Sequence, residues 1–202
     1  EPVGTMGGMD TISFRAHIMA VERVEKRLRT VAAALDDAGI PYAVVGGNAV
    51  AAWIGRVDRA ATRATKDVDL LVRRSDLERR TQALAARGFR REDIRSRTLF
   101  VDPAEPSRRS GVHLVWAGER VRPSYGWPAP LVEEAVRDPE GFLVLDLPAL
   151  VRMKLTSLRL IDQVHIVDML AVGLIDDAVR AALPEALRER LVQVEQSADE
   201  DA

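Results

Sequence analysis

Two hydrophobic patterns divide the chain near residue 148. Before that point, short apolar runs alternate with polar segments that contain glycine, which is typical of strands connected by helices and turns. After it, apolar residues recur at intervals of three and four as far as residue 196, which is typical of helices. The pattern therefore predicts a core over residues 10–147 and a helical C-terminal region over residues 148–196.

Within the core, one long apolar stripe predicts a helix over residues 16–38 that ends at Gly39. Two more helices are expected over residues 48–54 and 76–87, the second with Ser75 as its N-cap. Short apolar runs predict strands over residues 42–45, 67–72, 98–101, 111–116 and 142–145.

The two ends of the chain lack these patterns. Residues 1–9 are expected to be disordered or to be a cloning remnant before a native Met9, and the acidic tail over residues 197–202 is expected to be disordered. The helices of the C-terminal region are expected to begin at Pro148, Asp176 and Pro184.

Composition excludes some classes of protein. The 202 residues include no cysteine, so neither a disulfide framework nor a thiolate metal site can form. This fits the cytoplasm, where we expect the protein to reside. No apolar run is long enough to span a membrane, so no membrane partner is expected. The formal net charge of −2 gives no strong indication of nucleic-acid binding by the molecule as a whole.

Candidate chemistry is concentrated in a Gly46-Gly47 turn and an Asp67-Val68-Asp69 strand. Side chains alternate along a strand, so the two carboxylates share one face, about 6–7 Å apart. They repel one another unless a cation lies between them, and magnesium suits oxygen ligands of this kind. Glycines let backbone amides approach a phosphate, and a following helix N-terminus favours anions. The two motifs together predict a site for a metal-bound nucleoside triphosphate.

The order of these motifs resembles the polymerase-β-type nucleotidyltransferase superfamily, in which a hydrophobic residue and Gly-Gly precede an Asp-x-Asp strand. The stretch Val44–Val72 is similar to small bacterial abortive-infection (AbiEii-like) nucleotidyltransferase toxins. A second stretch, Met153–Asp168, is similar to the Lys-Leu…Arg-x-x-Asp helices that follow the catalytic core of those proteins. The similarity extends over residues 38–176.

The resemblance implies an α+β fold, in which a mixed β-sheet is flanked by helices and followed by a helical C-terminal part. It also implies transfer of a nucleoside monophosphate from a triphosphate to an acceptor hydroxyl. Asp67 and Asp69 would hold Mg²⁺ (or Mn²⁺), which orients the triphosphate. The phosphates would be cradled by Gly46, Gly47 and the backbone amide of Asn48.

Two lysines complete the predicted nucleotide site. Lys66 directly precedes Asp67, and by resemblance Lys154 reaches the triphosphate. For Lys154 the alternative is an ordinary lysine at the edge of the helices. Tyr125 and Trp127 could stack on a base, although loop aromatics more often cover the core.

One departure from the superfamily concerns spacing. Nineteen residues separate Gly47 from Asp67, which is longer than usual. The excess lies in segment 55–65, which contains Arg56, Arg59 and Arg63. We interpret it as a surface insertion, and the alternative is an arginine-bearing flap over the triphosphate.

A second departure concerns the third carboxylate that active members carry on a later strand. His113 stands at that position here, in the strand Gly111–Trp116. Imidazole is a poor magnesium ligand but a competent general base. His113 is therefore a general base, part of a changed metal site, or a sign that catalysis is lost, and the alternative is simple packing. Other carboxylates that could replace the missing ligand are Glu119, Asp102 and Asp146.

A helical series, Asp162, His165 and Asp168, places three polar side chains at intervals of three. Zinc could bind such a series. We favour an ordinary Asp–His pair that locks two helices together.

Three functions fit this sequence. The first is a magnesium-dependent nucleotidyltransferase with RNA, a protein or a small molecule as acceptor. Under this interpretation it could be the toxin of a toxin–antitoxin or phage-defence pair, with an antitoxin as partner. The second is a catalytically weakened relative that binds a nucleotide or a partner. The third is an aminoglycoside- or lincosamide-type adenylyltransferase. Fold alone does not choose among them.

Overall fold

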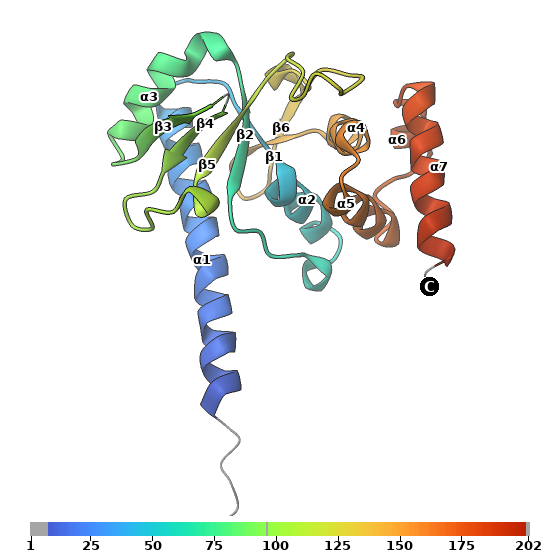
Figure 1. The fold of residues 1–202 in the computed structure, drawn as a ribbon, viewed down its shortest axis with the longest axis horizontal. Helices are drawn as coiled ribbons and strands as arrows, with labels where there is room; N and C mark the ends of the chain where they lie inside the picture. Colours follow the sequence, from blue (N-terminus) through green and yellow to red (C-terminus); the bar gives the residue numbers. More distant parts are fainter. Residues whose placement is uncertain (1–7, 96, 201–202) are drawn as a thin grey trace, which may run out of the picture.

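A seven-stranded mixed β-sheet forms the centre of the protein (Figure 1), as a computed structural model of residues 8–95 and 97–200 shows. The strand order is β3-β4-β5-β2-β1-β7-β6. Neighbouring strands are parallel in the pairs β2–β5 and β1–β7 and antiparallel in the others. The strands are β1 (Ala43–Val45), β2 (Val68–Val72), β3 (Arg90–Ile94), β4 (Arg97–Val101), β5 (Val112–Trp116), β6 (Ala135–Arg137) and β7 (Leu143–Leu145).

Helices surround this sheet and make up the C-terminal part of the chain. Their bounds are α1 (Gly8–Asp37), α2 (Gly46–Gly55), α3 (Leu77–Ala85), α4 (Leu147–Ser157), α5 (Leu160–Ala171), α6 (Asp177–Ala181) and α7 (Glu185–Glu200). Short 3₁₀ turns lie between them, among them Arg59–Ala61 in the α2–β2 connection and Arg74–Asp76 before α3. The predicted α+β fold with a helical C-terminal part is confirmed.

The hydrophobic core is centred on β1 and β2. All three residues of β1, Ala43, Val44 and Val45, are fully buried. Since successive strand residues point to opposite faces, both faces of β1 are covered. Helix α2 contacts β1 and β2 and also α5, while α1 contacts α3 and β2. This packing fixes the sheet between helices and places the carboxyl end of β1 against the start of α2.

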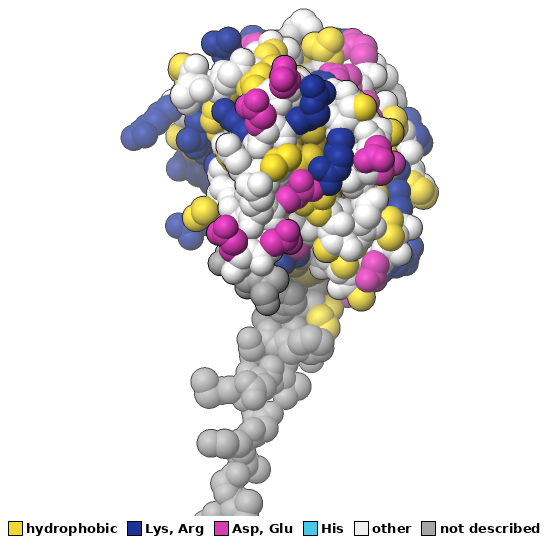
Figure 2. Space-filling model, turned by 90° about the vertical axis from the view of Figure 1, so that its right-hand side faces the viewer, with side chains coloured by type: hydrophobic (Ala, Val, Ile, Leu, Met, Phe, Trp, Pro, Cys, Tyr) yellow, Lys and Arg dark blue, Asp and Glu magenta, His cyan; other side chains and the backbone are white. Residues whose placement is uncertain are grey.

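The C-terminal helices are defined by side-chain caps. Asp146 accepts a hydrogen bond from the Ala149 amide at 2.8 Å and begins α4, and Asp176 accepts one from the Val179 amide at 2.9 Å and begins α6. Helices α4, α5 and α7 pack against one another. The outer face formed by α6 and α7 carries acidic and basic side chains side by side, as expected of a solvated surface (Figure 2). Among the described residues, no helix is both apolar enough and long enough to cross a membrane.

Several local predictions need correction. Ser75 does not cap α3, because it lies inside the 3₁₀ turn Arg74–Asp76 that leads into the helix. Strands β3 and β6 were not predicted, since their sequences, Arg-Arg-Glu-Asp-Ile and Ala-Val-Arg, are polar or very short and depend on pairing with β4 and β7. Residues 197–200 belong to α7, whereas disorder was expected from residue 197. The remaining terminal residues, 1–7 and 201–202, lie outside the described part of the chain.

Candidate active site

A cavity of about 770 Å³ opens beside β2 and β5. Its wall includes Gly46, Asp67, Asp69 and His113, so four of the predicted site residues meet in one place. The connection after β5 and the corner between α4 and α5 enclose the other sides, and Lys154 lines the cavity from α4. Three other predicted residues, Gly47, Asn48 and Lys66, are not part of its lining.

Asp69 and His113 are neighbours across the parallel strands β2 and β5. They are register partners, so their side chains project from the same face of the sheet. The pKa of Asp69 is raised to about 6, first by burial and then by the nearby Asp67, and His113, Lys154 and Arg159 partly oppose this rise. His113 Nε2 is buried and has no hydrogen-bond partner among the described residues. The pair therefore combines a carboxylate that attracts a cation with an imidazole that the described residues leave without a hydrogen bond.

The other carboxylate, Asp67, is held by its neighbours. Thr65 Oγ1 donates a hydrogen bond to Asp67 Oδ1 at 3.2 Å. Asn48 Nδ2 donates to the Asp67 carbonyl oxygen at 2.6 Å. Asn48 thus fixes the entry of β2, and its side chain is occupied with protein rather than directed to the cavity. Lys66, next to Asp67, is exposed.

Gly46 lies against the Asp69 carboxylate. Helix α2 begins at this residue, whose φ of +69° is a conformation that favours glycine. A Cβ built on Gly46 would lie 2.1 Å from Asp69 Oδ2, so no side chain fits there. At Gly47 the nearest atom to such a Cβ is Thr65 Cβ, at 3.3 Å. Gly46 is therefore the residue that brings the N-terminal turn of α2 next to the aspartates.

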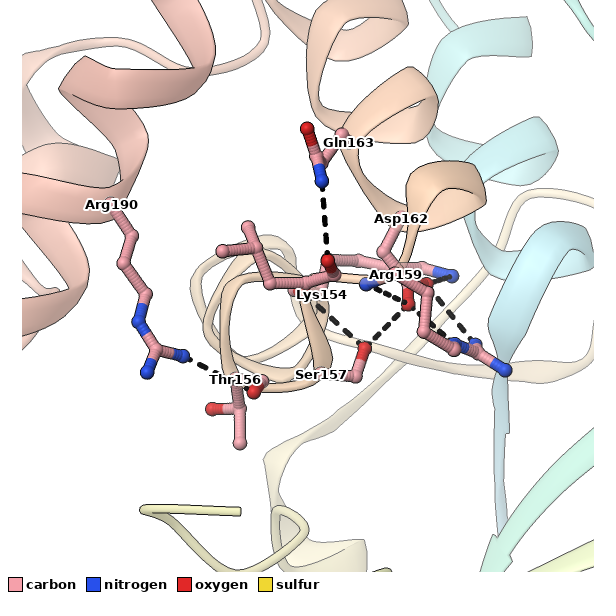
Figure 3. Close-up of polar contacts among 8 residues, drawn as sticks. Lys154, Thr156, Ser157, Arg159, Asp162, Gln163 and Arg190 are labelled. Atoms are coloured by element: carbon pink, nitrogen blue, oxygen red, sulfur yellow. Dashed lines mark hydrogen bonds and ion pairs between the residues drawn. The ribbon is translucent and has the colours of Figure 1, made fainter. Parts of the chain in front are cut away.

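A buried ion-pair network forms the corner between α4 and α5 (Figure 3). Asp162 accepts hydrogen bonds from Lys154 Nζ at 3.0 Å, Ser157 Oγ at 2.5 Å and Arg159 Nε at 2.7 Å. Burial by itself raises the pKa of Asp162, but the Arg159, Lys154 and Ser157 contacts outweigh it and hold the pKa at about 2. Lys154 comes from α4, whereas Arg159 is the N-cap of α5 rather than part of the preceding helix. This network gives the cavity a rigid, cationic wall.

The helical series contains no zinc site. Asp162 is occupied as above, and Asp168 accepts hydrogen bonds from Arg63 at 2.5 and 3.0 Å. His165 is buried, and burial lowers its pKa to about 4. The expected Asp–His pair is wrong, because Asp162 pairs with Lys154 and Arg159 and His165 Nδ1 has no partner among the described residues. The ion pair between Asp162 and Lys154 connects α5 to α4 instead.

The three carboxylates considered as replacements for a third metal ligand all have other partners. Asp102 pairs at 3.0 Å with the buried Arg27 of α1, and Asp146 caps α4. Glu119 lines the cavity but pairs with Arg74 at 2.7 Å. Across the described ranges, no group of three or more His, Asp or Glu side chains is arranged to hold a metal ion. Asp67 and Asp69 are therefore the carboxylates left for a cation, and His113 remains beside them.

The long α2–β2 connection does not cover the cavity. Arg63 pairs with Asp168 on α5, and Arg56 pairs with Asp138 at 2.8 Å. Arg59 is exposed and outside the lining. The arrangement agrees with a surface insertion and does not support an arginine flap.

Three aromatic residues line the cavity. They are Trp116, Tyr125 and Trp127. The position of Tyr125 and Trp127 is compatible with stacking on a base. Arg74 lies over the Trp116 ring at 4.2 Å, and Arg190 of α7 lies 5.8 Å from the Trp127 ring. Arg190 also donates to the Thr156 carbonyl (Figure 3) and to the Leu155 carbonyl, which ties this part of the wall to α4.

Arg97 and Thr98 are among the lining residues that were not predicted as site residues. They begin β4, far from the glycine and aspartate motifs in the sequence, and reach the cavity because β4 pairs with β5. Only the pairing of β4 with β5, a long-range property, could have revealed them.

The fold is that of a nucleotidyltransferase. The solution structure of the antibiotic-resistance factor ANT(2'')-Ia superposes with a TM-score of 0.54 and 17% sequence identity, covering 90% of this chain and 97% of that one. An antigenic nucleotidyltransferase-like protein from Paracoccidioides brasiliensis superposes with a TM-score of 0.58 and 17% identity, covering 90% and 91%. No curated protein sequence matches the chain significantly.

The family follows from the sequence itself. Residues 13–122, more than half of the chain, match the family described as "Uncharacterised nucleotidyltransferase". The chain belongs to this family and is a nucleotidyltransferase. The matched region contains Gly46, Asp67, Asp69 and His113, and it ends within the connection that follows β5.

Proposed function

We propose that this nucleotidyltransferase moves a nucleoside monophosphate from a magnesium-bound triphosphate to an acceptor hydroxyl, with His113 as the general base. The observation that carries the proposal is the register pairing of Asp69 with His113 in the cavity wall, directly beside Gly46. It joins three features that such transfer needs: a site for the cation, room for phosphate and a group that accepts a proton.

The residues present fit a divalent cation. Asp67 and Asp69 offer hard carboxylate oxygens, and the raised pKa of Asp69 reflects a buried charge that a cation would stabilise. Magnesium bound there would neutralise negative charge on the triphosphate during the displacement. With two carboxylates at this position, the remaining ligands would have to come from the triphosphate and water, as is common for magnesium.

The side chains of the cavity divide the remaining work. Lys154 and Arg159 present positive charge to the triphosphate, and Arg159 is well suited to do so because its side chain is 55% exposed. His113 takes the proton of the acceptor hydroxyl through its imidazole, which forms no hydrogen bond with the described residues. The acceptor oxygen then bonds to the α-phosphorus, the bond from that phosphorus to the bridging oxygen breaks, and pyrophosphate leaves.

The experiment is a label-transfer assay. The purified protein is incubated with magnesium, each α-labelled ribonucleoside triphosphate in turn, and either total RNA, a protein extract or a mixture of small hydroxyl compounds. Wild type should label one fraction, and the double variant Asp67→Asn, Asp69→Asn should not. Asp37→Asn, at an exposed surface pair with Arg87, is the matched control and should behave as wild type.

Two outcomes would contradict the proposal. Equal labelling by wild type and the double variant would show that the aspartates do not hold the metal. Triphosphate binding by wild type without transfer to any fraction would favour the catalytically weakened, binding-only alternative.

A toxin role rests on the AbiEii-like resemblance of residues 44–72 and 153–168. It predicts that induced expression of wild type arrests bacterial growth, whereas the double aspartate variant, at equal abundance, does not. Normal growth with an active enzyme would remove this part of the proposal, along with the antitoxin partner it implies.

A further inference from the structure

Charge in the cavity is unevenly balanced. The basic lining residues are Arg74, Arg97, Arg120, Arg122, Lys154 and Arg159, and the acidic ones are Asp67, Asp69, Glu119 and Asp162. Glu119 is neutralised by Arg74, and Asp162 by Lys154 and Arg159. The two remaining acids are those proposed to hold the cation.

Three arginines of the lining have no acidic partner among the described residues. Arg97, Arg120 and Arg122 are exposed, and their guanidinium groups form no ion pair or hydrogen bond with any residue that the structure describes. Arg122 lies 5.8 Å from the Tyr125 ring. An arginine fork matches phosphate oxygens, so unpaired arginines around one cavity favour an anionic ligand.

Arg97 lies away from Lys154 and Arg159, the residues proposed to contact the triphosphate. Lys154 and Arg159 belong to the α4–α5 corner, which lies on the other side of the molecule from β4 (Figure 1). Arg97 opens β4, two residues before Leu99, which is the register partner of His113. Since residues two apart share a strand face, Arg97 projects from the same face as His113 and Asp69. His113 therefore lies between the aspartates and Arg97.

We infer that the acceptor of this enzyme carries a phosphate group near its reactive hydroxyl, and that Arg97, with Arg120 and Arg122, binds that phosphate. The inference rests on the proposed function, which it extends to the class of acceptor. A phosphate on Arg97 would hold the acceptor over β5, where its hydroxyl can meet His113. The same chemistry is found in a small sugar phosphate and in the phosphodiester backbone of an RNA end, and the experiment separates these sources.

This charge pattern disfavours the aminoglycoside-type alternative. A polycationic acceptor would meet three unpaired arginines, and like charges at one site oppose binding. Its only unneutralised acidic contacts would be Asp67 and Asp69, which the cation would occupy. A resistance enzyme for such antibiotics needs the opposite excess of charge.

The test measures binding by calorimetry. The 202-residue protein is saturated with magnesium and a non-hydrolysable triphosphate analogue. It is then titrated with ribose 5-phosphate, ribose, kanamycin and a single-stranded RNA of about ten nucleotides with a free 3′-hydroxyl. We expect a phosphate-bearing probe to bind at least about 10-fold more tightly than ribose or kanamycin. Ribose 5-phosphate would identify a small acceptor, and binding of the RNA alone would identify an RNA end.

Variants of Arg97 test whether this residue binds the phosphate of the probe. Arg97→Ala should weaken binding of the preferred probe by about 10- to 100-fold, and Arg97→Lys should restore part of it. Arg59→Ala, an exposed arginine outside the cavity, should have no effect. Thermal unfolding of each variant checks that the fold is retained.

Three results would overturn the inference: no binding of either phosphate probe, binding of ribose or kanamycin as tight as that of the phosphate probes, or unchanged binding by Arg97→Ala. The proposed function is tested separately in the same titrations. Failure of wild type to bind the triphosphate analogue would contradict that function. The phosphate probes are also titrated against the nucleotide-free protein, and those titrations still report on Arg97.

Discussion

Asp69 of β2 and His113 of β5 are register partners on adjacent parallel strands, and both line the same cavity. Where the superfamily resemblance implies a third carboxylate, β5 carries an imidazole whose Nε2 has no hydrogen-bond partner in the described part of the chain. The two strands thus bring the proposed metal ligand and the proposed proton acceptor together. The precision of the site depends on strand pairing, which is more rigid than a loop.

Gly46 is expected to be the most sensitive backbone position. Gly46→Ala places a methyl group where Asp69 Oδ2 now lies, and it also strains a residue with φ of +69°. We expect loss of magnesium-dependent triphosphate binding and a stability decrease of about 1–3 kcal/mol. Calorimetry and urea unfolding measure the two effects.

The neighbouring glycine is the control for this prediction. Gly47→Ala brings its methyl group to 3.3 Å from Thr65 Cβ, which a small shift of the threonine can relieve. Binding should therefore be retained in Gly47→Ala. Equal losses in both variants would mean that Gly46 has no special relation to Asp69.

Removing Asp162 from its buried ion pair with Lys154 should destabilise the protein more than removing Lys154. Asp162→Asn leaves the buried Lys154 ammonium without its counterion, which typically costs about 3–5 kcal/mol. Lys154→Met should cost less, because Asp162 keeps its hydrogen bonds from Arg159 and Ser157. Urea unfolding gives the free energy of unfolding of each variant. A larger decrease in Lys154→Met than in Asp162→Asn would contradict the prediction.

His165 should make the protein sensitive to mild acid. Burial lowers the pKa of His165 from 6.5 to about 4, Lys154 and Arg159 act in the same direction, and Asp162 and Asp168 oppose them. Between pH 6.5 and 4 the unfolded chain binds a proton at this residue and the folded protein does not. The contribution of His165 to the free energy of unfolding is therefore complete above pH 6.5. As the pH falls toward 4 this contribution is lost, which lowers the free energy of unfolding by up to about 3 kcal/mol.

The measurement compares wild type with His165→Leu across this pH range. The variant should lose less stability than wild type on acidification, since leucine takes up no proton. Asp69, whose raised pKa gives the opposite slope, is present in both proteins, so its contribution cancels in the difference. Parallel pH profiles would show that His165 is not the cause.

The sequence allowed the centre of the site to be predicted, because its residues lie in two short local motifs. Gly46, Asp67 and Asp69 are identified by the glycine turn and by alternation along one strand, and His113 by its place in a later strand. The glycine motif also predicted Gly47 and the Asn48 backbone amide as phosphate contacts, and this stays a prediction. Both residues lie in the first turn of α2, and the Asn48 side chain binds the backbone of Asp67.

The rest of the site depends on contacts between distant segments. Arg97 reaches the cavity only because β4 pairs with β5, and no local pattern marks it. Strand β3 has a polar sequence, and its hydrogen bonds to β4 hold it in place. An Asp–His pair was predicted within the series Asp162, His165 and Asp168, but at the corner between α4 and α5 Asp162 pairs with Lys154 instead.

The central claim is that His113 accepts the proton of the acceptor, and its most direct test is the single-turnover rate of nucleotidyl transfer by His113→Ala. With the acceptor fraction identified by label transfer, we expect a rate about 10²–10⁴-fold below that of wild type, with unchanged triphosphate affinity. His113→Asp, which restores a carboxylate, should keep magnesium-dependent activity. A rate for His113→Ala equal to that of wild type would contradict the account and leave His113 as a packing residue of β5.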